Sequence, residues 1–252
     1  MDRHFFILTG ASRGMGLAMA KQLIAKDHVL LCIARAKSLE LEELAAAKDA
    51  ILVQWSQDLA EPLVAAERLE EWLTDTEPAG LASATLINNA GMVPGVAPIE
   101  RLDSLELAAT LRVGLEAPML LTSAFLRATA KWSAQRRVLN ISSGLGRRAM
   151  ASQAAYCAAK AGLDHFSRCV ALEQEAQEKG ARICSLAPGV IDTDMQDQLR
   201  SADGALFADR DSFIGLKDQG QLATPQEAAA RVLAYLAQEN FGSNAVADVR
   251  DV

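Results

Sequence analysis

The sequence contains few residues of the types that build metal centres or disulfide frameworks. Its 252 residues include only four cysteines and three histidines. The cysteines form no close pairs with the spacing of metal ligands. Three of them lie in apolar or helical stretches, where a reduced, buried thiol is the usual state. We therefore expect no metal site and no disulfide framework, and we predict a cytoplasmic protein.

An excess of positive charge is also missing. The chain carries 25 lysines and arginines against 32 aspartates and glutamates, which gives a formal charge of −7. That sign is wrong for a surface that follows nucleic-acid phosphates. No apolar run reaches the roughly 18 residues that a membrane span requires, and the segment 1–7 carries both Asp2 and Arg3. We expect a soluble protein with neither nucleic acid nor a membrane as a partner.

What the chain does contain is an alternation of short apolar runs and longer amphipathic stretches. Its 50% hydrophobic and 23% charged residues form a globular composition that no linker divides. The predicted strands are residues 5–9, 29–34, 51–55, 84–88, 137–142 and 181–187, with a short last strand at 245–249. Helical patterns between strands are typical of the crossovers that build a parallel sheet. We predict one Rossmann-like α/β domain over residues 1–252, with a doubly wound parallel sheet.

The least regular stretch lies between the last two predicted strands, at residues 192–223. It contains Gly204, Gly215 and Gly220, and its helical periodicity is interrupted. Long irregular segments in compact domains often cover a cleft, so we predict a substrate lid here. A surface excursion without a role is the alternative.

A glycine-rich turn follows the first predicted strand. Gly10, Gly14 and Gly16 lie between that strand and the helix-forming run 17–23. Missing side chains permit a tight turn and let a pyrophosphate approach the backbone N–H groups at the positive end of a helix. With a strand before it and a helix after it, this turn predicts a dinucleotide site.

A second group of residues has the chemistry of proton transfer. Tyr156 and Lys160 are four residues apart in a helical pattern, which places them on one helix face. A neighbouring ammonium group favours the phenolate, so we expect Lys160 to lower the pKa of Tyr156. Ser143 ends the fifth predicted strand, at the sheet edge where ligands of open sheets bind, and its hydroxyl would hold a substrate carbonyl. The adjacent Ser142 is the competing assignment.

These motifs occur in a characteristic order. The glycine turn comes first, then Asp58-Leu59, then Asn88-Asn89-Ala90-Gly91, then Ser143 with Tyr156 and Lys160, and finally Pro188-Gly189. In this order, over nearly its whole length, the chain resembles the short-chain dehydrogenase/reductase family. Within that family it is most similar to the benzil reductase and sepiapterin reductase branch.

The resemblance implies reduction of a carbonyl to an alcohol with a nicotinamide cofactor. Ser143, Tyr156 and Lys160 would be catalytic, with Lys160 also binding the nicotinamide ribose. The implied cofactor contacts are Gly10, Ser12, Arg13, Gly14, Met15, Gly16, Arg35, Asp58, Leu59, Asn89, Ala90, Gly91, Tyr156, Lys160, Pro188, Gly189, Ile191 and Thr193. The implied substrate contacts are Ser143, Gly144, Tyr156 and Asp248, although Asp248 also fits an acid on the surface at a strand end.

The charge at the end of the second predicted strand bears on the choice of cofactor. An acidic residue there would bind a ribose 2′-OH, whereas a 2′-phosphate needs cations. The segment 32–37 has no acid, and Arg13 and Arg35 would clamp a phosphate from two sides. We therefore predict NADP(H), with two solvated surface arginines as the alternative.

The residues beside the inferred site bear on the choice of substrate. Apolar residues beside the inferred site favour an apolar or aromatic carbonyl compound, and the resemblance suggests a 1,2-dicarbonyl. These residues are Met92, Val93, Pro94, Leu145, Met150, Met195 and Phe207. Reduction of a 3-oxoacyl thioester and a non-catalytic NADPH-binding regulator are the alternative functions.

One position departs from the family pattern. The family usually has an asparagine in the long helix after the fourth strand, where it anchors a water relay to the active lysine. This chain has Gly114 there, so either water fills the space or proton resupply is slower. The long predicted helices 104–131 and 153–178 are rich in small or apolar residues, which favours a homodimer or homotetramer.

Overall fold

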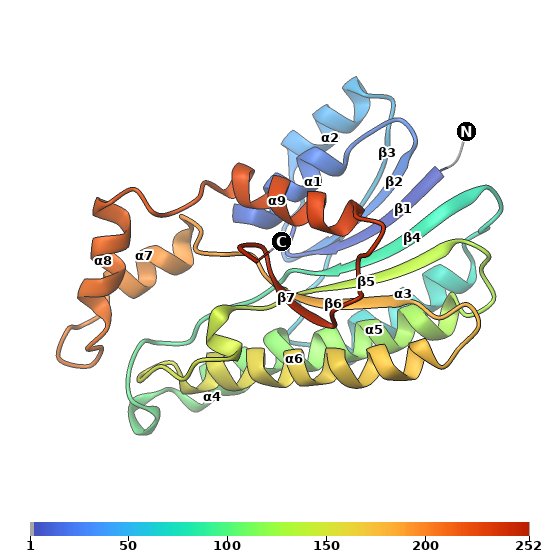
Figure 1. Cartoon of the computed structure of the whole chain (residues 1–252). Coiled ribbons are helices and arrows are strands. Elements are labelled where there is room, and N and C mark those ends of the chain that lie inside the picture. The colour runs from blue at the N-terminus through green and yellow to red at the C-terminus, as the bar shows by residue number, and fades with distance from the viewer. Residues whose placement is uncertain (1–2, 252) are drawn as a thin grey trace.

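Parallel strands form the centre of the molecule (Figure 1). The computed structural model describes residues 3–251, and within them one seven-stranded sheet has the order β3-β2-β1-β4-β5-β6-β7. The strands are β1 (Arg3–Thr9), β2 (His28–Ala34), β3 (Ile51–Ser56), β4 (Leu81–Asn88), β5 (Gln135–Ile141), β6 (Arg182–Ala187) and β7 (Val246–Asp248). Strand order reverses between β1 and β4, and such a switch point opens a crevice at the carboxyl edge of the sheet.

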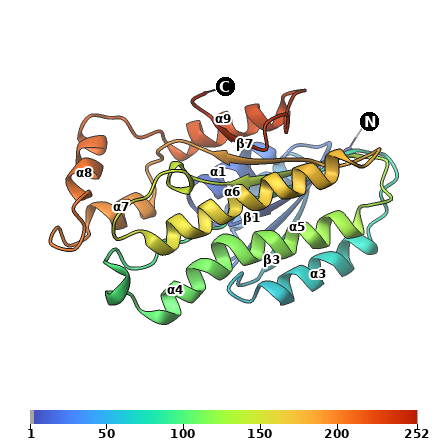
Figure 2. The same ribbon diagram turned by 60° about the horizontal axis from the view of Figure 1, so that its bottom comes forward.

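Helices cover both faces of the sheet (Figures 1 and 2). One face carries α1 (Gly14–Leu23), α2 (Leu39–Ala47) and α9 (Pro225–Ala237), and the other carries α3 (Pro62–Thr74), α4 (Ser104–Leu111), α5 (Ala117–Ala128) and α6 (Ala154–Glu175). Side chains of a strand alternate between the faces. In β1, Leu8 belongs to the core under α1 and α9, whereas Phe5 and Ile7 belong to the core under α3 and α5. The predicted doubly wound sheet is therefore confirmed.

The long helix predicted at 104–131 differs from the structure. It is divided into α4, a π-helical segment η2 (Arg112–Glu116) and α5, which ends at Ala128. Gly114 lies in the π-helical segment, where a Cβ would come within 3.1 Å of the Cβ of Ala159 on α6. Close packing of α6 against η2 thus fills part of the space that an asparagine side chain would occupy.

The irregular stretch 192–223 contains two short helices, α7 (Asp194–Arg200) and α8 (Arg210–Asp218), which lie beyond the carboxyl edge of the sheet (Figure 1). Leu199, Phe207 and Phe213 form a small apolar cluster, against which Val96 and Met150 also pack. The placement of Phe207 beside the substrate was therefore wrong, because this side chain is fully buried within the cluster. Its role as a lid stays a prediction.

The remaining sequence features also have a place in the fold. All four cysteines are free thiols, and Cys169 is exposed on α6 whereas Cys32 and Cys184 are buried in strands. Within residues 3–251, no helix combines the length and the apolar character that crossing a membrane would demand.

Candidate active site

A cleft of about 1450 Å³ runs along the carboxyl edge of the sheet. Every residue that the sequence analysis named as a cofactor contact, as catalytic or as a substrate contact lines this one cleft, whereas Pro94 and Phe207, which were expected beside the substrate, do not line it. They reach it because the carboxyl ends of parallel strands meet at the same edge. The volume exceeds that of an ordinary small-molecule pocket, as a dinucleotide together with a second ligand would require.

The glycine turn has a backbone that only glycine accommodates. Gly10 has a φ of +71°, and a Cβ on Gly16 would collide with the carbonyl oxygen of Gly10. The side-chain amide of Asn89 donates to the carbonyl oxygen of Thr9 at 2.9 Å, and the backbone N–H of Asn89 donates to the Thr9 hydroxyl. Asn89 therefore holds the turn in place.

The start of α1 suits a phosphate group. Arg13 is the N-cap residue, and its side chain makes no capping hydrogen bond. The first N–H groups of a helix have no partner within the helix, so at this end they remain available to an anion, and the helix dipole favours negative charge. These features fit the pyrophosphate of a dinucleotide.

The two arginines predicted to bind a 2′-phosphate both line the cleft, but their surroundings differ. The Arg13 guanidinium donates to Asp194 at the start of α7, at 3.0 Å, in an exposed ion pair. Arg35 is exposed just beyond β2, where its backbone carbonyl accepts a hydrogen bond from the Ser56 hydroxyl. Within the described residues the edge after β2 carries no acidic side chain before Glu40.

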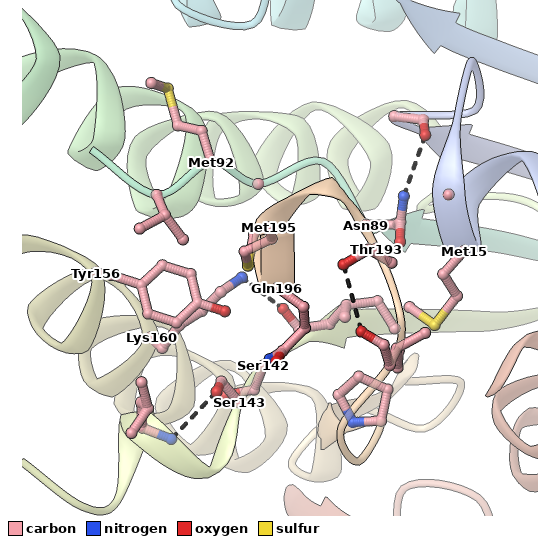
Figure 3. Close-up of a pocket in the computed structure, with 18 of the residues that line it drawn as sticks. Met15, Asn89, Met92, Ser142, Ser143, Tyr156, Lys160, Thr193, Met195 and Gln196 are labelled. Atoms are coloured by element: carbon pink, nitrogen blue, oxygen red, sulfur yellow. Dashed lines mark hydrogen bonds between the residues drawn. The ribbon is translucent and has the colours of Figure 1, made fainter. Parts of the chain in front are cut away.

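The proposed catalytic residues come together at the other end of the cleft (Figure 3). Tyr156 and Lys160 are buried on α6, and the Lys160 ammonium lies 5.7 Å from the centre of the Tyr156 ring. Lys160 Nζ donates to the carbonyl oxygen of Ile141 at 2.7 Å, which fixes the lysine beneath the end of β5. Ser143 Oγ accepts a hydrogen bond from the backbone N–H of Leu145 at 3.1 Å.

Burial controls the acid–base properties of this group. It lowers the pKa of Lys160 to about 8, and the negative charge of Asp164 only partly opposes this shift. Burial also raises the pKa of Tyr156, against a smaller opposite effect of the Ser143 hydroxyl. The net shift of the Tyr156 pKa is thus upward, not downward as the sequence analysis expected, because desolvation penalises the phenolate.

An ion pair between the buried Asp164 and the partly exposed Arg147 lies one helical turn beyond Lys160. Asp164 accepts hydrogen bonds from the Ser185 hydroxyl at 2.7 Å and from Arg147 Nε at 3.1 Å. Arg147 also donates to the carbonyl oxygen of Ala247 at 2.8 Å. These bonds join the loop after β5 to α6, β6 and β7, and so support the floor of the cleft.

Asp248 is not the surface acid that the sequence analysis left as an alternative. Its side chain is buried, and the Arg250 guanidinium donates to both of its carboxylate oxygens, at 2.8 and 2.6 Å. These hydrogen bonds hold the pKa of Asp248 below its usual range. Asp248 does line the cleft, but its charge is already paired.

Two buried glutamines are among the cleft residues that the sequence analysis missed. Gln153 precedes the first turn of α6, and Gln196 lies in the first turn of α7. Both are buried, and each has a side-chain oxygen without a hydrogen-bond partner among the described residues. Their nearness to Tyr156 and Thr193 in the sequence was the available signal, but glutamine is common on helix surfaces and neither stood out.

Comparisons with known proteins identify the family to which the chain belongs. A family model described as short chain dehydrogenase matches residues 4–204. A benzil reductase ((S)-benzoin forming) from Bacillus cereus is 36% identical over 237 residues, covering 94% of this chain and 95% of that protein. A sepiapterin reductase from Meriones unguiculatus is 34% identical over 258 residues, covering 97% and 95%.

A solved structure from Agrobacterium tumefaciens with bound NADP gives a TM-score of 0.79 at 25% identity, covering 99% of this chain and 95% of that one. Each sequence match extends over nearly the whole length of this chain and of the relative. With its parallel sheet, its glycine turn and the cleft at the sheet edge, the chain belongs to the short-chain dehydrogenase/reductase family.

Proposed function

We propose that this protein is an NADPH-dependent reductase of ketones, and that its preferred substrates are apolar or aromatic 1,2-dicarbonyl compounds. The observation that carries the proposal is the position of Ser143, Tyr156 and Lys160 in the same cleft as the glycine turn. A dinucleotide cofactor and a ketone substrate could therefore bind together in this cleft, with the cofactor phosphates at the glycine turn and the substrate beside the residues that transfer a proton.

The cofactor would lie along the cleft from the glycine turn to the end of β5. The N–H groups at the start of α1 would bind its pyrophosphate, Asp58 and Leu59 its adenine end, and Ile191 and Thr193 its carboxamide. When bound, a reduced nicotinamide supplies a hydride, the two-electron reductant that turns a ketone into an alkoxide.

The residues of the chain supply orientation and a proton. Ser143 Oγ donates a hydrogen bond to the ketone oxygen and polarises the carbonyl, and the Tyr156 hydroxyl gives its proton to that oxygen as the alcohol forms. A raised pKa keeps Tyr156 in its proton-bearing form before the reaction. In its protonated form, the Lys160 side chain contributes a positive charge beside the tyrosinate that remains.

Preference for NADPH over NADH is supported by charge. Arg13 and Arg35 line the cleft, and the segment directly after β2 has no acid to bind a ribose 2′-OH. Binding of a 2′-phosphate would draw Arg13 away from Asp194, so this exposed ion pair would be exchanged for a stronger charge-assisted contact.

The preference for an apolar dicarbonyl is supported by the lining of the cleft and by the relatives. Met92, Val93, Leu145, Met150 and Met195 surround the catalytic end. The Bacillus cereus relative is named for reducing benzil, an aromatic 1,2-diketone. An apolar lining favours such a compound over a highly charged one.

The test is a ketone panel with both cofactors. The purified protein is mixed with NADPH or NADH and with aromatic diketones, simple ketones or a 3-oxoacyl thioester, while the absorbance of the reduced cofactor is followed. We expect the highest kcat/KM for an aromatic diketone with NADPH, and loss of turnover in Tyr156→Phe. Binding of NADPH without turnover of any compound would instead indicate a non-catalytic regulator, and a preference for the thioester would indicate an acyl reductase.

Two further predictions accompany this function. Leu105 on α4, Met119 on α5 and Leu172 on α6 are exposed apolar side chains on the helices of one face, which supports helix packing between subunits of a homodimer or homotetramer. The four free thiols are consistent with the predicted cytoplasmic compartment.

A further inference from the structure

We propose that Gln196 determines substrate specificity by donating a hydrogen bond to the second carbonyl oxygen of a 1,2-dicarbonyl substrate. This inference rests on the reductase function proposed above and adds a residue that selects among ketones. It starts from the buried polar groups that the fold leaves without partners.

Among the described residues, three of the six buried side-chain atoms without a hydrogen-bond partner belong to residues that line the cleft. The atoms in the cleft belong to Ser142, Gln153 and Gln196. A protein rarely leaves such groups unpaired, because each has lost its hydrogen bonds to water. Unpaired polar groups in a ligand cleft indicate partners on the ligand.

The three groups are not equivalent. The Gln153 amide nitrogen donates to the carbonyl oxygen of Ser152 at 2.9 Å, so its free oxygen can only accept a hydrogen bond. Ser142 adjoins Ser143 at the extended end of β5, and successive side chains of an extended chain point to opposite sides. With Ser143 on the side of Tyr156, Ser142 faces away from the reacting carbonyl.

Gln196 has neither restriction. Within residues 3–251 its side chain makes no hydrogen bond, although the residue is only 9% exposed. An amide that no partner fixes can turn to present either its oxygen or its NH₂ group. A ketone oxygen only accepts hydrogen bonds, so the NH₂ group of Gln196 is the matching partner.

The position of Gln196 suits this role. Its backbone N–H donates to the carbonyl oxygen of Thr193 at 2.8 Å, which fixes the residue in the first turn of α7. Figure 3 shows Gln196 within the space that Ser143, Tyr156 and Lys160 also face. When one carbonyl group of the substrate lies between Ser143 and Tyr156, the second carbonyl group is on the adjacent carbon atom. It then points towards the rest of the cleft.

The test compares two ketones that share a carbon skeleton. Diphenylethanedione has two adjacent carbonyls, whereas 1,2-diphenylethanone has one. We expect Gln196→Met, which keeps the length of the side chain and removes its donor, to lower kcat/KM for the diketone about tenfold, the effect of losing one hydrogen bond. The value for the monoketone should stay within about twofold of wild type, and the Kd for NADPH should not change.

A second variant and a matched control distinguish loss of the Gln196 hydrogen bond from a general disturbance of the segment 192–223. Gln196→Glu replaces the donor by a carboxylate that only accepts, so it should lower diketone turnover at least as much. Gln198, two residues further along α7, already donates to the carbonyl oxygen of Pro94 at 3.0 Å. Gln198→Met should therefore loosen the segment without changing the ratio between the two ketones.

The possible outcomes distinguish a failure of the proposed reductase function from a failure of the proposed role of Gln196. If wild-type protein and NADPH reduce neither ketone, both the proposed function and the role of Gln196 are overturned. If wild type reduces both ketones but their ratio is unchanged in Gln196→Met and Gln196→Glu, only the role of Gln196 is overturned. A changed Kd for NADPH with an unchanged ratio would instead assign Gln196 to the cofactor.

Discussion

Replacing Lys160 with methionine should stabilise the cofactor-free protein near neutral pH while it removes activity. The ammonium group of Lys160 is buried at the catalytic end of the cleft, with Asp164 as the nearby negative charge that favours its protonated form. Asp164 is already paired with Arg147. The folded protein therefore holds an ammonium group whose charge is poorly compensated.

The size of the effect follows from the pKa. The pKa of Lys160 falls from its ordinary value of 10.5 to about 8 on folding, and each pKa unit corresponds to about 1.36 kcal/mol. At pH 7, the protonated Lys160 side chain therefore destabilises the folded protein by about 3 kcal/mol. The hydrogen bond from Lys160 to the carbonyl oxygen of Ile141 offsets about 1 kcal/mol of this cost. Lys160→Met should thus be more stable than wild type by about 2 kcal/mol at pH 7.

The pH dependence has a definite sign. Because the folded pKa lies below the unfolded pKa, the unfolded chain binds more protons between about pH 8 and 10.5, and wild-type stability rises with pH through that window. At pH 9.5 the cost of the charge has fallen by about 2 kcal/mol, so the advantage of Lys160→Met should disappear.

Urea unfolding of both proteins without cofactor, at pH 7 and pH 9.5, measures this difference. Other titrating groups are common to both proteins and cancel in the comparison. Lys131 is exposed, so Lys131→Met serves as the control and should show no such change. A stability difference between Lys160→Met and wild type that is the same at both pH values would refute the reasoning, because it would mean that burial does not penalise this charge.

Three further substitutions test other parts of the structure. Gly16→Ala places a Cβ against the carbonyl oxygen of Gly10, so NADPH affinity measured by titration should fall at least about tenfold; ordinary affinity would show that the turn adapts. Gly114→Asn must displace Ala159 by a few tenths of an ångström and should cost about 1 kcal/mol in thermal unfolding, with the Kd for NADPH unchanged; a markedly altered Kd would contradict the local effect. Tyr156→Phe should lower kcat at least about 100-fold while its melting temperature stays near that of wild type, and residual activity above that level would require another proton donor.

Much of the fold was predictable because its signals are local. A short apolar run followed by an amphipathic stretch repeats along the chain, and that pattern fixes both the type and the order of the elements. Some predicted boundaries differ from the structure: β7 is shorter than the predicted strand 245–249, and the π-helical turn at Gly114 interrupts a long helix. Packing against α6 accompanies that interruption, and helical periodicity does not reveal packing partners.

The candidate site also combines features that the sequence alone predicts with features that depend on the tertiary structure. The sequence by itself determined the glycine turn after β1 and the spacing of Ser143, Tyr156 and Lys160, because strand-end turns and helix faces depend on residues close in the chain. Only the tertiary structure decided that Asp248 is buried against Arg250 and that Gln196 lies unpaired in the cleft. It also decided the direction of the Tyr156 pKa shift, since the burial that raises this pKa arises from segments distant in the sequence.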